Sequence, residues 1–322
     1  MLVRILKYWK YPDILRQTPG STGVWNGINF VIDEPGRCDY AIIHGRLEEP
    51  TWVRCPKGHI WLVMGEAPHE LAESWHKIWG NIDRAYMTDE RKVSEKHILS
   101  YSFSPWWVDK DYDYLTSCPP CEKTKALSWV TSNKSEFSGH RYRLKFLEKI
   151  RMLDELDLYG RGHAPISGKW EALAPYRYSI AFENYSNSHY WSEKVMDCFL
   201  AWTMPIYYGC TQLDQFFPRG SYIQLDPEMS DPVAFLREVI NSDLRERNID
   251  AIREARHRVL NDYNLFNVIA HEIAVIEEKY SKNRPKALPR LILNHTTGRS
   301  QIFPTWMRPA CHALKLLTTK GK

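Results

Sequence analysis

The sequence predicts an α/β protein built from two Rossmann-like domains that face a cleft, and three observations support this. The first third contains short apolar runs, and two of them, AIIHG and IWLVMGE, end in Gly or polar residues as buried parallel strands do. From residue 126 onward, strand-like runs alternate with helical patterns, which is typical of βαβ units. Between the two regions lies DKDYDYLTSCPPCEKTK, a polar stretch that we expect to be the linker. The predicted domains are residues 1–120 and 121–322.

The expected elements follow from local patterns. In the first domain, apolar runs occupy residues 2–9, 24–33, 38–45 and 59–66. Residues 69–80 have helical spacing and a Gly stop. In the second domain, residues 140–153 place four apolar side chains on one helical face. Further strands are expected at 126–133, 156–160, 176–184, 205–209 and 221–226, and further helices at 192–202, 211–217, 231–241, 243–259 and 265–281.

Composition excludes several classes of protein. Hydrophobic residues make up 43% of the chain and charged residues 25%, as in an ordinary globular protein with a large core. The net charge of +4 is low for a nucleic-acid binder, so no nucleic-acid partner is expected. No apolar run reaches the length of about 18 residues that predicts a membrane span, and the N-terminus lacks the features of a signal peptide. We therefore expect a cytoplasmic protein.

The C-terminal segment over residues 300–322 is apolar and basic. Two interpretations fit this composition: packing against the body of the protein, or peripheral contact with an anionic membrane surface such as the inner membrane.

Neither cysteines nor acidic clusters predict a metal site. The seven Cys are irregularly spaced, which argues against a disulfide framework. Cys118 and Cys121 lack the second pair that a structural zinc site needs, so two ordinary thiols are favoured over a redox or metal role. Asp109, Asp111 and Asp113 repeat a DxD pattern, but they lie in the expected linker. A solvated acidic loop is favoured there.

The stretch AFENYSNSHYWSEK collects the strongest chemical signal. Glu183 and Asn184 end an expected strand, and Ser192 is a natural N-cap that leaves Glu193 and Lys194 in the first helical turn. A lysine there opposes the helix dipole, whereas an anion bound at the helix end explains it. Carboxylates accept hydrogen bonds from sugar hydroxyls, and an amide donates and accepts. The set indicates a nucleotide-sugar site; the alternative is a surface helix with an acid and a stray lysine.

Other phosphate-binding signatures are absent from the sequence. It contains neither GxGxxG nor a P-loop, which disfavours dinucleotide dehydrogenases and kinases of those types.

The longer stretch YRYSIAFENYSNSHYWSEKVMDCFLAWTMPIYYG resembles the signature of the α-1,3/4-fucosyltransferases of glycosyltransferase family 10. The resemblance extends upstream to SN at 132–133, Arg143 and DLYGRG, and downstream to FFPRGSYIQLD. In the first domain it is limited to WLVMGEAPH. Since the sequence shows no N-terminal anchor, it is more similar to the bacterial members, which modify lipopolysaccharide-type glycans, than to the animal Golgi enzymes.

The resemblance implies a GT-B fold with the donor nucleotide in the C-terminal domain, no required metal or cofactor, and inverting transfer of fucose from GDP-fucose. The expected acceptor is a glycan, through O3 or O4 of N-acetylglucosamine or glucose, in protein or lipopolysaccharide glycosylation. By the family pattern, Lys194 and Arg143 hold the diphosphate. The ribose and the fucosyl group are contacted by Glu193, Asn184 and Tyr190, and Glu183 shapes the same pocket.

Glu66 matches the position of the family's general base. Inversion by one displacement needs a carboxylate that takes the acceptor proton, and cations that stabilise the charge growing on the diphosphate. Glu70 and Glu90 are rival carboxylates, and His69 is a neighbour that orients the acceptor or is incidental. Two alternatives stay open: the same fold with another nucleotide-sugar donor, or a non-catalytic glycan- or nucleotide-binding protein.

Three positions in the motif depart from the usual family pattern. Ser192 stands for the commoner Thr, and His189 and Trp191 are bulky residues that we expect in a loop over the donor pocket.

Overall fold

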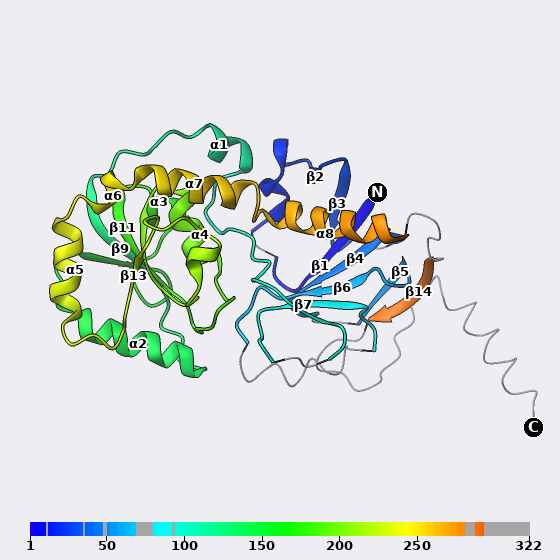
Figure 1. Ribbon diagram of the computed structural model, residues 1–322, viewed down its shortest axis with the longest axis horizontal. Helices are drawn as coiled ribbons and strands as arrows, with labels where there is room; N and C mark the ends of the chain where they lie inside the picture. The colour runs from blue at the N-terminus through cyan, green and yellow to red at the C-terminus, as the bar shows by residue number, and fades with distance from the viewer. Residues whose placement is uncertain are drawn as a thin grey trace, which may run out of the picture.

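The computed structural model describes residues 1–280 and 287–292, apart from 11, 35, 48–49, 69–79 and 92–93; for residues 280 and 287–292 it describes the backbone alone. Figure 1 shows two α/β units side by side, one with the blue and cyan strands of the N-terminal half and one with the green strands of the C-terminal half. The expected helix over 69–80 falls on residues outside this description except Gly80. The C-terminal segment over 300–322 lies outside it entirely.

The N-terminal unit contains a seven-stranded sheet in the order β2-β3-β1-β4-β6-β7-β8. All its pairings are parallel except that of β2 with β3. The strands are β1 (Leu2–Lys7), β2 (Val24–Trp25), β3 (Ile28–Ile32), β4 (Tyr40–His44), β6 (Ile60–Val63), β7 (Arg84–Met87) and β8 (His97–Leu99). Every residue of β4 and β6 is buried, which explains their continuous apolar runs.

The apolar run over 24–33 forms a hairpin. Asn26 and Gly27 have φ angles of 48° and 75°, as the central residues of a tight two-residue turn require. The chain therefore reverses between β2 and β3 before β3 pairs with β1.

The C-terminal unit contains a five-stranded, wholly parallel sheet in the order β10-β9-β11-β12-β13. Its strands are β9 (Lys125–Val130), β10 (Leu156–Tyr159), β11 (Tyr176–Phe182), β12 (Met204–Tyr208) and β13 (Ile223–Gln224). These five strands are the ones predicted after residue 126. The predicted linker contains a short helix, α1 (Tyr112–Ser117), and the structure adds a helix that the pattern did not predict, α3 (Lys169–Leu173).

Helices cover both faces of this second sheet. One face packs against α2 (Ser138–Ile150) and α5 (Pro232–Asn241), and the other against α4 (Glu193–Leu200) and α7 (Ile249–Leu260). Ile180 and Phe182 of β11 point to the first face and Ala181 to the second, as the alternation of a strand requires. A short α6 (Leu244–Arg247) precedes α7, so the helix expected over 243–259 is broken at Asn248. The short helix expected over 211–217 is a 3-10 turn, Leu213–Gln215.

The last helix, α8 (Leu265–Tyr280), returns to the N-terminal sheet, as Figure 1 shows in orange. Its Phe266 and Ile269 are buried in one cluster with Val3 and Ile5 of β1. The backbone of β14 (Ala287–Ile292) pairs antiparallel with β5 (Thr51–Pro56). The two larger sheets lie on either side of residue 120, but α8 packs against the first of them. A boundary that assigns all of 121–322 to one domain therefore stays a prediction.

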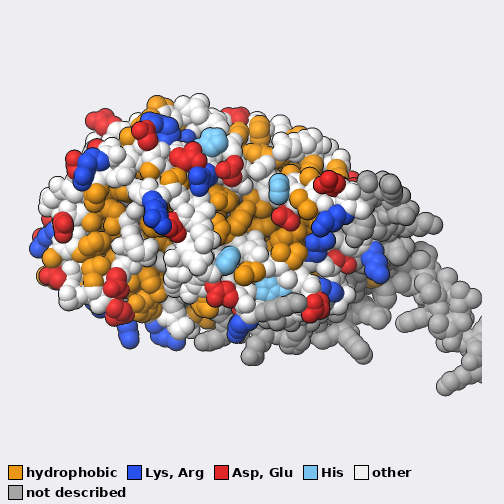
Figure 2. All heavy atoms as spheres, in the orientation of Figure 1, with side chains coloured by type: hydrophobic (Ala, Val, Ile, Leu, Met, Phe, Trp, Pro, Cys, Tyr) orange, Lys and Arg blue, Asp and Glu red, His pale blue; other side chains and the backbone are white. Residues whose placement is uncertain are grey.

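The predicted fold class, two Rossmann-like domains of the GT-B type, is confirmed by these two layered, largely parallel sheets. In Figure 2, acidic and basic side chains are mixed over the visible face, without a broad area of one sign. Among the described residues, no helix combines the length and the apolar character that a membrane crossing requires. Cys118 and Cys121 have sulfur atoms 4.0 Å apart and form no disulfide.

Candidate active site

A cavity of about 670 Å³ lies between the two units, where strands of both sheets end. Tyr8, Gly45 and Gly65 follow β1, β4 and β6, while Thr131 and Asn184 follow β9 and β11. Ligands of open α/β sheets bind outside the carboxyl ends of parallel strands, so this cavity is the expected location of a site. Six of the seven predicted site residues line it, namely Glu66, Arg143, Asn184, Tyr190, Glu193 and Lys194.

Glu183, the seventh, lies directly behind the wall. Its side chain is fully buried, and its carboxylate accepts hydrogen bonds from the Ser192 amide (2.8 Å), the Ser192 hydroxyl (2.7 Å) and Lys194 Nζ (2.8 Å). The same hydroxyl caps α4 by accepting from the Lys194 amide. Burial raises the pKa of the Glu183 carboxyl, and the Lys194 ammonium opposes that shift. Glu183 therefore holds the loop, the helix start and the lysine together.

Lys194 has a protein partner that the sequence argument did not consider. Two of the three ammonium donors are used by Glu183 and by Ser192 Oγ at 2.9 Å. Burial alone lowers the pKa of Lys194, but Glu183 and Glu193 outweigh it and raise the pKa well above its usual value. The ammonium stays charged, and it also lies 3.5 Å from the Glu193 carboxylate. A bound anion is thus not needed to explain why a lysine occupies this first turn.

Lys169, at the start of α3, is a further cation of this wall that the sequence reasoning missed. Its Nζ lies 3.8 Å from the Glu193 carboxylate and 2.6 Å from that of Asp197, which is itself buried. Burial opposes ionisation of Glu193, yet Lys194 and Lys169 together lower the pKa of its carboxyl to about 2. Since Lys169 lies 24 residues before Glu193 (193 − 169), no local pattern marks it. Arg161 and Lys134 add two more cationic groups to the same wall.

Arg143 reaches the cavity from α2 and is buried. Its guanidinium donates to Asn184 Oδ1 at 2.8 Å and to the Ser132 carbonyl at 2.9 Å, while its Nε has no protein partner. The start of α2 lies so close to β11 that a Cβ at Gly139 would stand 1.7 Å from the Asn184 carbonyl oxygen. This close approach brings Arg143 and Asn184 together.

The loop between β11 and α4 is anchored to the N-terminal unit. Asn187 donates to the Thr88 carbonyl at 2.7 Å, and its own side-chain oxygen accepts from the Tyr190 amide at 2.7 Å. Tyr190 is thereby held against the cavity, and burial raises the pKa of its phenol well above the usual value. Glu90 accepts hydrogen bonds from the backbone and hydroxyl of Ser188 and does not line the cavity.

The expectation that Trp191 covers the donor pocket is wrong. Its ring is 1% exposed and stacks on Tyr101 with centroids 5.3 Å apart, in the core where the two units meet. A large apolar surface gains more from burial there than from a position over a polar cavity. His189 packs near Phe216 and likewise does not line the cavity.

Glu66 lies on the opposite wall, directly after Gly65. It is exposed to the cavity and accepts a hydrogen bond from the Tyr8 hydroxyl at 2.9 Å. Burial, together with the nearby Glu66 carboxylate, raises the pKa of Tyr8, so the phenol remains a neutral donor. Trp9 and Trp107 line the same side, with ring centroids 5.9 Å apart. Of the rival groups, Glu70 and His69 lie outside the described residues.

The DxD aspartates have structural partners. Asp109 accepts from the Trp170 amide (2.9 Å), Asp111 caps α1 at Tyr114 (2.8 Å), and Asp113 accepts from the Gly20 amide (2.9 Å). In the part of the chain that the structure describes, no group of three or more His, Cys, Asp and Glu side chains has the arrangement of a metal site. The metal-free chemistry expected from the sequence stays a prediction.

Comparison with protein families gives a match over residues 120–244, to glycosyltransferase family 10 (fucosyltransferase), C-terminal part. The match confirms the family resemblance that the motifs of this region predict.

Similar sequences include three fucosyltransferases. The human 3-galactosyl-N-acetylglucosaminide 4-alpha-L-fucosyltransferase FUT3 is 24% identical over 206 residues, 56% of this chain and 56% of that protein. The human 4-galactosyl-N-acetylglucosaminide 3-alpha-L-fucosyltransferase FUT6 is 28% identical, over 54% of this chain and 52% of that protein. The Bos taurus FUT3 is 30% identical over 40% of this chain and 35% of its own length. The chain thus spans about half the length, or less, of these relatives.

Among solved structures, an alpha1,3-fucosyltransferase with GDP-fucose matches with a TM-score of 0.46 and 14% identity, over 79% of this chain and 82% of that chain. The T4 phage BGT in complex with UDP-glucose matches with a TM-score of 0.48 and 9% identity, over 86% of this chain and 99% of that chain.

Proposed function

We propose that this chain, whose residues 120–244 match glycosyltransferase family 10, is a member of that family and transfers fucose from GDP-fucose to a hydroxyl of a glycan acceptor with inversion. One observation carries the proposal beyond family membership. Glu66 on one wall of the cavity faces a wall formed by Arg143, Lys194 and Glu193. A carboxylate on one side and cations on the other are what a single displacement of a diphosphate requires.

The donor is held by the C-terminal wall. Lys194 and Arg143, which both line the cavity, bind the diphosphate, where negative charge grows as the bond to the sugar breaks. Glu193, which stays ionised because its pKa is about 2, accepts from ribose hydroxyls. The Asn184 amide and Tyr190 contact the ribose and the fucosyl group. Glu183 does not reach the donor and acts by fixing Lys194.

The acceptor is held by the N-terminal wall. Trp9 and Trp107 offer ring faces on which a sugar stacks with its C–H groups. The names of the relatives point to an N-acetylglucosaminide acceptor. Glu66 takes the proton of the attacking hydroxyl, and Tyr8 keeps the carboxylate oriented. Attack from this side, opposite the diphosphate, inverts the anomeric centre.

Two other functions are candidates, namely the same fold with another nucleotide-sugar donor and a non-catalytic glycan- or nucleotide-binding protein. A pocket that recognises diphosphate and ribose is compatible with another nucleotide sugar. A non-catalytic binding protein needs no base, and the opposed Glu66 argues against it.

The decisive experiment measures turnover of GDP-fucose with a small panel of N-acetylglucosamine- and glucose-containing acceptors, with and without EDTA. We expect transfer in both conditions, because the cations of the donor wall perform the task of a metal. Donor hydrolysis with GDP- and UDP-sugars is measured in parallel. Preference for a UDP-sugar contradicts the assignment of fucose, loss of activity in EDTA contradicts the metal-free mechanism, and binding of GDP-fucose without hydrolysis or transfer supports a non-catalytic protein.

A further inference from the structure

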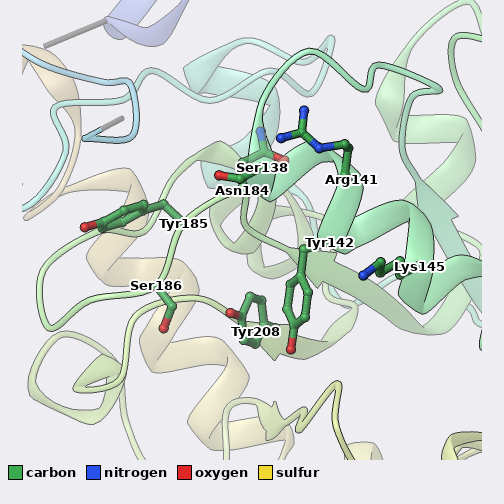
Figure 3. Close-up of a pocket in the computed structure, with 9 residues that line it drawn as sticks. Ser138, Arg141, Tyr142, Lys145, Asn184, Tyr185, Ser186 and Tyr208 are labelled. Atoms are coloured by element: carbon green, nitrogen blue, oxygen red, sulfur yellow. The ribbon is translucent and has the colours of Figure 1, made fainter. Parts of the chain in front are cut away.

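A second cavity, of about 680 Å³, lies in the C-terminal unit beside the first, and Figure 3 shows its lining. It is formed by the first turns of α2, the loop after β11 and the end of β12. The close backbone contact of Gly139 with Asn184 separates the two cavities. Asn184 is the one residue common to their described linings.

Three tyrosines give this second cavity an aromatic lining. Tyr142 and Tyr208 lie side by side with ring centroids 5.6 Å apart, and Tyr185 is 38% exposed, which is high for an aromatic residue. Tyrosines present both a ring face and a hydroxyl. Such a lining suits a ligand with C–H faces and many hydroxyl groups, which is the description of a saccharide.

The charged side chains among the described lining residues, Arg141 and Lys145, are both basic. Lys145 is exposed and, within the described part of the chain, forms no ion pair within 4.0 Å. Arg141 gives Nη1 to the carbonyls of Ser135 and Glu136, which leaves its other donors free. No acidic side chain is among the described lining residues, and the adjacent Glu228 is paired with Lys149 at 3.4 Å. The ligand that fits is therefore anionic as well as sugar-like.

We propose that this cavity is an accessory subsite for an anionic oligosaccharide, namely the part of the acceptor glycan beyond the sugar that receives fucose. The inference rests on the proposed transferase function. Asn184, which follows β11, lines both cavities, so a glycan that occupies both of them passes over this residue. Phosphate and carboxylate substituents share the chemistry that Lys145 and Arg141 recognise. Single-stranded nucleic acid also pairs anions with stacking groups, but the net charge of +4 favours a glycan.

The test compares wild type with Lys145→Glu, Lys145→Arg and a matched control, Arg151→Glu, at the far end of α2. Arg151 is a basic residue with a side chain 70% exposed, outside the lining of the cavity. The substrates are an N-acetylglucosamine-containing oligosaccharide in neutral, phosphate-bearing and carboxylate-bearing forms. We expect Lys145→Glu to raise KM for at least one charged form about fivefold, with KM for the neutral form and for GDP-fucose unchanged. Lys145→Arg and Arg151→Glu should behave as wild type.

The two charged forms distinguish which anion the subsite takes. The proposal is overturned if the KM for the charged acceptors equals the KM for the neutral acceptor both in the wild-type protein and in Lys145→Glu. The proposal is also overturned if a single-stranded oligonucleotide competes with the charged glycan more strongly for the wild-type protein than for Lys145→Glu.

Direct calorimetric titration with the charged oligosaccharides, in the presence of GDP, separates this inference from the proposed function. Absence of turnover with every acceptor refutes the transferase. Binding that is lost in Lys145→Glu still supports the subsite, and binding that is equal in both proteins refutes it.

Discussion

Among the described residues, the Glu66 carboxylate is one of two acidic groups that line the cavity, with Glu193, and it accepts a hydrogen bond from the Tyr8 hydroxyl at 2.9 Å. Its side chain is exposed and lines the cavity, so a hydroxyl group of a ligand can approach it. Glu90, the rival carboxylate, has its oxygen occupied by Ser188. At this scale the assignment of the base depends on access and on partners rather than on charge alone.

We expect Glu66→Gln to lower kcat for transfer about 10²- to 10⁴-fold, because the amide cannot accept the proton. GDP binding should stay at the wild-type level, since Glu66 comes from the N-terminal unit, whereas Arg143 and Lys194, the proposed diphosphate ligands, come from the C-terminal unit. Steady-state kinetics and GDP titration check both statements. Glu90→Gln is the matched control and should retain wild-type kcat. A fully active Glu66→Gln enzyme would show that another group is the base.

The pair formed by Lys194 and Glu183 allows a test that separates folding from binding. Lys194→Met leaves the Glu183 carboxylate buried without its counter-charge, which should cost about 3–5 kcal/mol of unfolding free energy. In Lys194→Met/Glu183→Gln the buried charge is also removed, so most of that stability should return. GDP binding should stay lost in both variants, because the donor to the diphosphate is missing.

Chemical denaturation and GDP titration of the two Lys194 variants provide the measurements. If the double variant bound GDP as wild type does, Lys194 would serve the fold and not the ligand.

At the scale of elements, α4 shows how far local sequence patterns reach. Ser192, Glu193 and Lys194 follow the rules of an N-cap and a first turn, so their common position was predictable. The position of Lys169 in the site was not predictable from the sequence. Its partner Asp197 lies in an ordinary helical pattern, and the ion pair forms only because α3 packs beside α4. Asp197 also accepts from the amides of Trp107 and Val108, which links α4 to the N-terminal side of the cavity, where Trp107 is a lining residue. Such contacts depend on tertiary structure that a single sequence does not encode locally.

We expect Ser192→Ala to cost about 1–3 kcal/mol of unfolding free energy and to raise KM for the donor, because it removes both the cap of α4 and a hydrogen bond to the buried Glu183. Asp231→Ala is the matched control: Asp231 caps α5 through the Ala234 amide at 2.9 Å and lies outside the cavity. It should lose about 1 kcal/mol with an unchanged KM. Thermal unfolding measures the stability of Ser192→Ala and Asp231→Ala, and steady-state kinetics measure their KM for the donor. Equal KM changes in both variants would mean that general loosening, and not the Glu183 contact, moves the donor site.

At the scale of the whole molecule, the alternation of strands and helices predicted the two sheets, because buried parallel strands and amphipathic helices leave clear periodic signals. The path of the chain after residue 260 was not predicted. The amphipathic pattern of α8 shows that one face is buried but does not say against which sheet. The choice of sheet depends on shape complementarity, such as the edge-to-face contact of Phe266 with Phe30, whose ring centroids are 4.9 Å apart.

This arrangement makes a prediction about how stability is shared between the units. Phe266 is fully buried against the N-terminal sheet, so Phe266→Ala should cost about 3–5 kcal/mol through the lost contacts and the cavity left behind. We expect hydrogen exchange to rise first in β1, β3 and β4, although the substitution lies more than 200 residues away in sequence (266 − 44 = 222). Val275→Ala, at a position 39% exposed on the same helix, should leave exchange unchanged. If protection fell first in β9, β11 and β12 instead, α8 would belong energetically to the C-terminal unit, and the domain boundary near residue 120 would hold through to the end of the helix.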